Sequence, residues 1–238
     1  MNAAEKQIVA DFLDITADFL GSGYKSEPKS YIFKDNKAEE SDKTPQIIEK
    51  DSDSIEKISQ EVLACRNCTL CEKRTNAVPG EGVKHPLVMV IGEGPGEDED
   101  RQGRPFTGRA GQLLDKMLSS IGLSRTENAF IANVVKCRPP DNRDPYPEEV
   151  SACAHFLERQ ISILKPKYIL CAGRVSAQSL LKTTEAIGKL RGKFTKFYSG
   201  SGVYPLLATF HPAALLRRED LKRPAWEDLK LLRSRLEI

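Results

Sequence analysis

The stretch LVMVIGEGPGE, residues 87–97, is an apolar run that passes directly into a glycine-rich turn. Residues 87–91 are short, continuously apolar and rich in β-branched side chains, which predicts a strand buried on both faces, as in parallel sheets. The turn then lies at the carboxyl end of this strand, where open α/β sheets bind their ligands. A phosphate-binding loop carries a lysine, whereas acidic residues 97–100 follow this turn, so nucleoside triphosphate binding is disfavoured.

The composition is that of a globular protein, and the net charge is close to zero. Its 238 residues are 39% hydrophobic and 29% charged, and the formal net charge is +2. This length suits one sizeable domain with an appendage. No stretch approaches the roughly 18 apolar residues of a membrane span, and no signal segment opens the chain. We therefore expect a cytoplasmic, monomeric protein with no membrane contact, in which any basic face is a local cluster.

Strand-like and helix-like segments alternate through most of the chain. Strands are predicted at 87–91, 129–136, 168–173 and 204–209, and 194–198 either pairs with the last strand or belongs to a crossover. Helices are predicted after Ser54, at 109–121, at 147–164 and at about 224–236. This alternation predicts a three-layer α/β/α sandwich with a central, mainly parallel, four-stranded sheet. Residues 1–23 are expected to form an amphipathic helix, 24–54 a charged flexible linker, and 55–238 the folded domain.

Six cysteines favour a metal site over disulfides. They are Cys65, Cys68, Cys71, Cys137, Cys153 and Cys171. Without a secretory signal, the close spacing of the first three points to a metal ion or an iron–sulfur cluster. The last cysteine lies inside an apolar strand, where a buried thiol is the better interpretation.

Several separate motifs recur together in one order. They are Cys65-x-x-Cys68, GEGPGEDED at 92–100, RPFTGRAGQLLD at 104–115, NVVKCRPPDNRDP at 133–145, Cys153, and HPAALLR at 211–217. In this combination the chain resembles the family 4 uracil-DNA glycosylases, iron–sulfur members of the uracil-DNA glycosylase superfamily, from about Val62 to the C-terminus. The resemblance implies an enzyme that binds uracil-containing DNA, hydrolyses the N-glycosidic bond of deoxyuridine, releases uracil and leaves an abasic site.

The resemblance also implies a [4Fe–4S] cluster held by Cys65, Cys68, Cys137 and Cys153. Four thiolates suffice for such a cluster. Cys71 is the main rival ligand, and structural zinc bound by the same thiolates is the alternative metal. The cluster would join the helix after Ser54 to the loop that carries Arg138 and Arg143. Those arginines would then contact DNA phosphates, or else form surface ion pairs.

A base-excising site must receive an extruded base, stack it and read its edge. The resemblance assigns stacking to Phe106 and reading of the uracil edge to Asn133; the alternatives are a core phenylalanine and a capped strand end. The backbone at Gly92, Gly94 and Gly96 would complete the pocket together with Glu93 and Glu97.

His211 follows a predicted strand, and a neutral imidazole there would donate to uracil O2 as negative charge develops on the departing base. The better-known uracil-excising family has an aspartate at the position of Gly94, so that general base is absent. The candidates for positioning water are Glu93, Glu97, Glu99 and Asn142, and the alternative is a solvated acidic loop.

Leu215, Leu216 and Arg217 would form a wedge that enters the DNA stack, or else simply begin an amphipathic helix. Two other kinds of protein fit the same chain. One is a catalytically inactive uracil-DNA-binding or polymerase-accessory protein, with a protein partner at the N-terminal helix. The other is an electron carrier, which the motifs far from the cysteines disfavour.

Overall fold

The computed structural model describes residues 53–236. The predicted helix at 1–23 and residues 24–52 of the predicted linker lie outside the described residues. Ser54 begins helix α2 (Ile55–Ala64) as the sequence predicts, because its side chain accepts a hydrogen bond of 3.1 Å from the backbone amide of Lys57.

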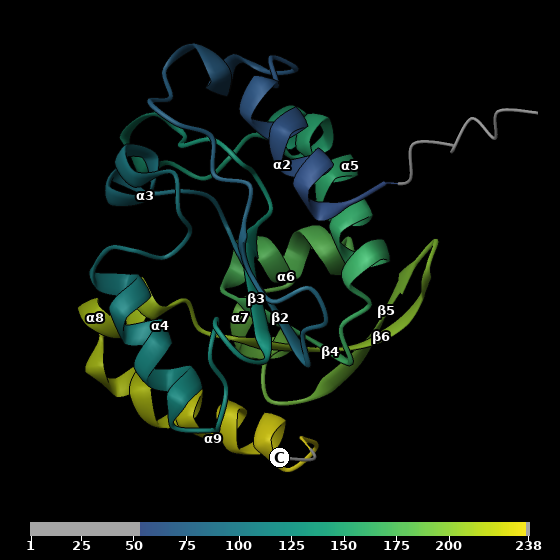
Figure 1. Cartoon of the computed structure of the whole chain (residues 1–238). Helices are drawn as coiled ribbons and strands as arrows, with labels where there is room; N and C mark the ends of the chain where they lie inside the picture. Colours follow the sequence, from purple (N-terminus) through teal and green to yellow (C-terminus); the bar gives the residue numbers. More distant parts are fainter. Residues whose placement is uncertain (1–52, 237–238) are drawn as a thin grey trace, which may run out of the picture. The chain divides into compact units, whose positions relative to one another are not determined.

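A six-stranded sheet, in the order β1-β3-β2-β4-β6-β5, forms the middle layer (Figure 1). Its parallel strands are β2 (Val88–Gly92), β3 (Ala129–Asn133), β4 (Tyr168–Ala172) and β6 (Gly202–Thr209). The sequence analysis predicted four strands, whereas the sheet has six. Strands β1 (Glu81–Gly82) and β5 (Phe194–Ser199) pair antiparallel at the two edges. A strand of two residues shows no alternation, so β1 has no sequence signal.

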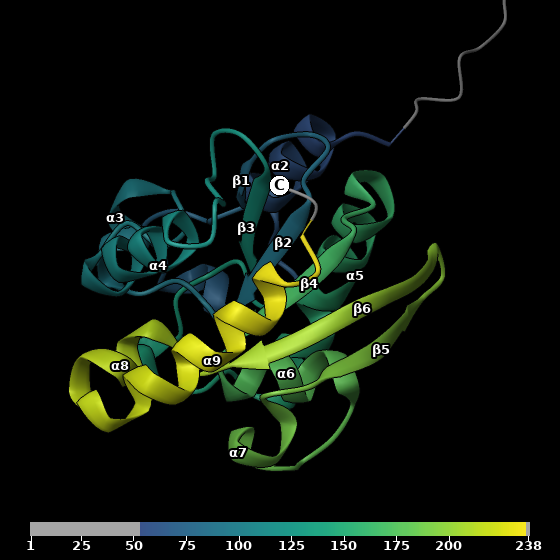
Figure 2. The ribbon, with the colours of Figure 1, turned by 90° about the horizontal axis from the view of Figure 1, so that it is seen from below.

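Helices cover both faces of the sheet, which confirms the three-layer α/β/α sandwich (Figures 1 and 2). One core packs α2, α5 (Pro147–Leu164) and α6 (Arg174–Leu181) on the sheet. The other packs α4 (Arg109–Ser119) and α9 (Lys222–Arg233) on the opposite face. The shorter elements are α3 (Glu97–Gln102), α7 (Ile187–Leu190), α8 (Pro212–Arg217) and 3-10 turns at Thr69–Glu72, Pro140–Asn142 and Glu219–Leu221.

The strand order makes the end of β2 a topological switch point, because β3 pairs with one side of β2 and β4 with the other. Gly92 is in register with Asn133, and Ala172 is in register with Thr209. The glycine turn and the segment that begins at His211 therefore lie at one edge of the sheet.

The acidic segment after the turn folds as helix α3, where the sequence suggested only a loop. Four acidic residues occupy its first turn, next to the positive end of the helix dipole. Gly103, with φ of 70°, ends it in the left-handed conformation. Among the described residues, no helix is long and apolar enough to cross a membrane.

Candidate active site

A pocket of about 390 Å³ opens at the carboxyl edge of the sheet. Most of the site residues expected from the sequence line it: Glu93, Gly94, Gly96, Glu99, Phe106, Asn133, Asn142, Arg143, His211 and Arg217. Glu97 does not, since its exposed carboxylate lies 3.6 Å from Arg138. The volume falls within the range of small-ligand pockets.

Gly92 does not line the pocket, but it packs directly against two residues that do, Phe106 and Asn133. A Cβ at Gly92 would lie 2.4 Å from Asn133 Oδ1 and 2.6 Å from Phe106 Cζ, so only glycine fits there. Asn133 is 2% exposed, and its Oδ1 has no hydrogen-bond partner. A buried amide oxygen without a partner is costly. Asn133 Oδ1 is therefore an unused acceptor on a residue that lines the pocket.

His211 lies beside Phe106, with ring centroids 5.6 Å apart and planes inclined by 31°. It is the N-cap of α8, and its Nδ1 accepts a hydrogen bond of 3.1 Å from the backbone amide of Ala213. Burial, with a smaller contribution from the charge of Arg217, lowers the pKa of His211 to about 4. At neutral pH the imidazole is uncharged, and because Nδ1 accepts, Nε2 carries the proton.

Glu93 contributes a carboxyl group with an altered pKa to this pocket. Burial raises its pKa to about 7; the negative charge of Asp144 adds to this rise and Arg174 opposes it. Asp144 and Arg174 form an ion pair with each other. The Glu93 carboxyl group therefore exchanges a proton near neutral pH, which suits general base catalysis.

Glu99 and Asn142 are engaged elsewhere, which argues against the catalytic roles considered for them. The Glu99 carboxylate accepts hydrogen bonds from the backbone amides of Gly96, Thr107 and Gly108, at 3.0 to 3.1 Å. Asn142 Oδ1 accepts a 2.8 Å hydrogen bond from Arg138 Nε. Glu99 thus holds the pocket loops in place.

Arg143, one of the two arginines expected to contact DNA phosphates, is already paired within the protein. Arg143 donates two hydrogen bonds, of 2.8 and 2.7 Å, to the buried carboxylate of Glu149, and its guanidinium stacks 3.7 Å from the centre of the Tyr146 ring. The structure therefore agrees with the ion-pair alternative for Arg143.

The expected wedge is divided by helix α8. Leu215 is 2% exposed and packs inside the protein, whereas Leu216 is 42% exposed. The wedge prediction is therefore corrected for Leu215, because a core side chain in this conformation cannot enter DNA. Only Leu216 and Arg217 are accessible for it.

Cysteines from three parts of the chain line one cavity: the segment just after α2, the loop after β3, and α5. They are Cys65, Cys68, Cys71, Cys137 and Cys153. Arg74 donates a 3.0 Å hydrogen bond to the sulfur of Cys137, and the backbone amide of Lys136 donates one of 3.3 Å to Cys153. Within residues 53–236, no three potential ligands are placed to hold a single metal ion. The thiols lie together beside the positively charged guanidinium of Arg74. This environment suits an iron–sulfur cluster, which carries negative charge when it is bound by thiolates. Cys171 is fully buried in β4, as the sequence indicated.

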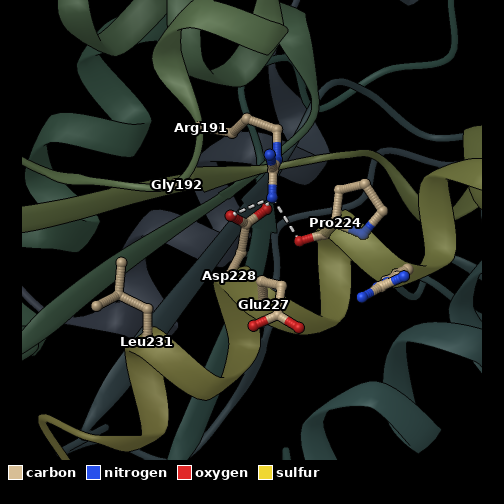
Figure 3. Close-up of a pocket in the computed structure, with 7 residues that line it drawn as sticks. Arg191, Gly192, Pro224, Glu227, Asp228 and Leu231 are labelled. Atoms are coloured by element: carbon tan, nitrogen blue, oxygen red, sulfur yellow. Dashed lines mark hydrogen bonds and ion pairs between the residues drawn. The ribbon is translucent and has the colours of Figure 1, made fainter.

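Sequence reasoning missed two residues that support the pocket, and the first is Asp228. Together with Arg191 it lines a separate hollow of about 420 Å³ (Figure 3). Asp228 is 1% exposed and accepts hydrogen bonds from Thr209 Oγ1 at 2.7 Å and Arg191 Nε at 2.9 Å. It thus anchors β6 two residues before His211. An acidic residue on the apolar face of α9 was its sequence signal.

The second missed support is Arg125, which follows α4. It donates hydrogen bonds to the backbone oxygens of Pro105 and Phe106, at 2.9 and 3.1 Å. No motif in the sequence marks this residue, because its partners are backbone atoms.

Comparison with known proteins gives the class to which this fold and pocket belong. The family model described as Uracil DNA glycosylase superfamily matches residues 79–230, a range that contains the pocket and both of its supports.

Individual relatives narrow the class further. The chain is 46% identical to a type-4 uracil-DNA glycosylase of Sulfurisphaera tokodaii over 76% of this chain and 84% of the relative. It is 42% identical to the type-4 enzyme of Archaeoglobus fulgidus, over 75% and 91%, and 44% identical to that of Thermotoga maritima, over 76% and 93%. The chain therefore belongs to the type-4 uracil-DNA glycosylases.

Proposed function

We propose that this protein excises uracil from DNA, by hydrolysing the N-glycosidic bond of deoxyuridine and leaving an abasic site for repair. Family membership supports this activity. The observation that carries it in this chain is the buried, unpartnered Asn133 Oδ1, which lies against Gly92 as the Phe106 ring does.

Asn133 supplies the chemistry that selects uracil. Its Oδ1 accepts from uracil N3–H, and its Nδ2 donates to uracil O4. Cytosine presents an acceptor at N3 and a donor at C4, so both contacts would fail. A site that leaves buried polar groups unpaired rejects the wrong base strongly. Phe106 provides the ring against which the extruded base stacks.

His211 stabilises the departing base. As the bond between C1′ and N1 breaks, negative charge develops on uracil, and the Nε2–H of neutral His211 donates to uracil O2. A preorganised donor in a partly buried site needs little reorganisation during the reaction. The low pKa of His211, about 4, keeps this imidazole from becoming a cation at neutral pH.

Glu93 is the best placed of the candidates for positioning water. It lines the pocket, and its pKa of about 7 lets it accept a proton from the water that adds to C1′. Glu99 is a poorer candidate because its carboxylate oxygens already accept from backbone amides.

Cys65, Cys68, Cys137 and Cys153 would hold the [4Fe–4S] cluster, with Cys71 as the fifth thiol of that cavity. Bound by these thiolates, the cluster would cross-link the segment just after α2, the loop after β3 and α5. Leu216 and Arg217 contact the DNA beside the extruded nucleotide, since both are exposed next to the pocket.

Uracil release from defined oligonucleotides tests this function. Duplexes with U:G or U:A pairs, and single-stranded uracil DNA, are incubated with the protein and cleaved at abasic sites. We expect cleavage only at uracil, and none in matched DNA with cytosine or thymine at that position. Protein that releases no uracil from any of the three substrates would contradict the proposal.

A further inference from the structure

Phe106 has an unusual backbone conformation for its residue type. Its φ is 53°, in the left-handed region that side chains other than glycine rarely adopt. Such a conformation persists where the surrounding structure enforces it, often at functional sites. Phe106 is only 6% exposed and its ring lies in the base pocket. Something outside the ring must therefore maintain this turn.

Arg125 contacts the turn from its carbonyl side. Its side chain is 12% exposed, and its two terminal nitrogens donate to Pro105 O at 2.9 Å and to Phe106 O at 3.1 Å. The guanidinium is aligned by Asp115 of α4, whose Oδ1 accepts from Nε at 3.1 Å and from Nη2 at 2.8 Å. The planar fork of arginine suits this set of acceptors, and lysine cannot reproduce it.

Two other features hold the same turn from different sides. Glu99 accepts from the backbone amides of Thr107 and Gly108, at 3.0 and 3.1 Å. Gly111 of α4 lies so close that a Cβ there would be 1.8 Å from Phe106 O. Arg125 thus binds the carbonyls of this turn, Glu99 binds its amides, and Gly111 leaves the room that the turn needs.

We propose that Arg125 is a positioning residue for base recognition, which keeps Phe106 in its left-handed conformation and its ring in the stacking position. Arg125 does not line the pocket, so it acts only through Phe106. This proposal rests on the proposed function, because it names what sets the stacking surface of that same site.

The test compares Arg125→Gln with Arg104→Gln. Arg104 is the matched control, since it also carries a guanidinium near this turn and forms a bidentate pair with Glu81 at 2.8 Å, but no hydrogen bond to a turn carbonyl. The inhibition constant of free uracil reports pocket binding without catalysis. We expect Arg125→Gln to raise it by about tenfold, a part of the roughly 5- to 150-fold that stacking of a base on an aromatic ring contributes. The control should stay within about twofold of the unaltered protein.

A double-mutant cycle with Phe106→Leu separates positioning from general stability. If Arg125 acts through the ring, Arg125→Gln should weaken uracil binding no further in the Phe106→Leu background. Arg125→Lys should weaken uracil binding less than Arg125→Gln but should not match the unaltered protein, because lysine lacks the planar fork. If Arg125→Gln does not fold, Asp115→Asn gives the test, because it removes only the partly exposed carboxylate that aligns the guanidinium.

The outcomes are distinct. A tenfold loss for Arg125→Gln, absent from the control and from the Phe106→Leu background, supports the proposal. Equal inhibition constants for Arg125→Gln and Arg104→Gln, or losses that add fully to those of Phe106→Leu, would overturn it. An unaltered protein that releases no uracil would reject the proposed function instead, and direct titration with uracil would then still compare the variants.

Discussion

His211 has two separable duties, and two substitutions tell them apart. As the N-cap of α8, its Nδ1 accepts from the amide of Ala213, and under the proposed function its Nε2–H donates to the departing base from its place in the pocket. Asparagine is a good N-cap residue but lacks the imidazole donor, whereas alanine supplies neither. His211→Asn therefore removes the chemistry and retains the cap.

The size of each effect follows from the contact that is lost. Removing one donor to a developing negative charge costs about 10²- to 10³-fold in kcat, so we expect this loss from both variants. Loss of the N-cap costs about 1 kcal/mol, which lowers Tm by roughly 2–4 °C in a domain of this size. His211→Ala should show this additional loss of stability, and His211→Asn should show little of it.

Single-turnover excision from a U:G duplex, with thermal unfolding on the same samples, measures both quantities. His85→Ala is the matched control, because His85 is exposed and lies outside the pocket. Rates for His211→Asn within about threefold of the unaltered protein, far below the loss expected for an oxyanion donor, would refute the role given to this imidazole.

Three further predictions concern acidity, the cysteines and the support behind His211. The kcat/KM should rise with pH up to about 7, because Glu93 must lose its proton to accept one from water, and Glu93→Gln should lower and flatten this profile; an unchanged profile would exclude Glu93 as the base. Cys137→Ala should reduce the iron measured in purified protein and lower Tm; full iron occupancy would reject this ligand. Asp228→Ala removes the carboxylate that pairs with Arg191 and accepts from Thr209, and should cost about 3 kcal/mol in urea unfolding. This is near the low end for a broken buried pair, because Arg191 is 19% exposed and keeps its hydrogen bond to the backbone oxygen of Pro224. A change below about 0.5 kcal/mol, as at an ordinary surface site, would show that the pair is not important.

The parts of the pocket contributed by strand ends were predictable from the sequence. Parallel strands end at one edge of a sheet, so residues after separate apolar runs must meet there. Gly92, Asn133 and His211 come from three such positions, and the structure brings each of them to the pocket region. Short, continuously apolar runs that alternate with helices are enough for that inference.

Residues whose roles depend on tertiary partners were not predictable in this way. Leu215 and Leu216 are neighbours in the sequence, and only the docking of α8 decides which one is buried. Glu99 has the same side chain as Glu93 but is occupied by backbone amides. Arg125 binds backbone oxygens, which every residue possesses, so no sequence pattern marks its partners.

The main chain at Gly92 packs so tightly against Asn133 and Phe106 that not even a methyl group fits there. Exchanging this residue therefore cannot enlarge the pocket, because every other amino acid is bulkier than glycine. A variant that accepts bulkier nucleobases would have to be built by exchanges at the residues that line the pocket itself.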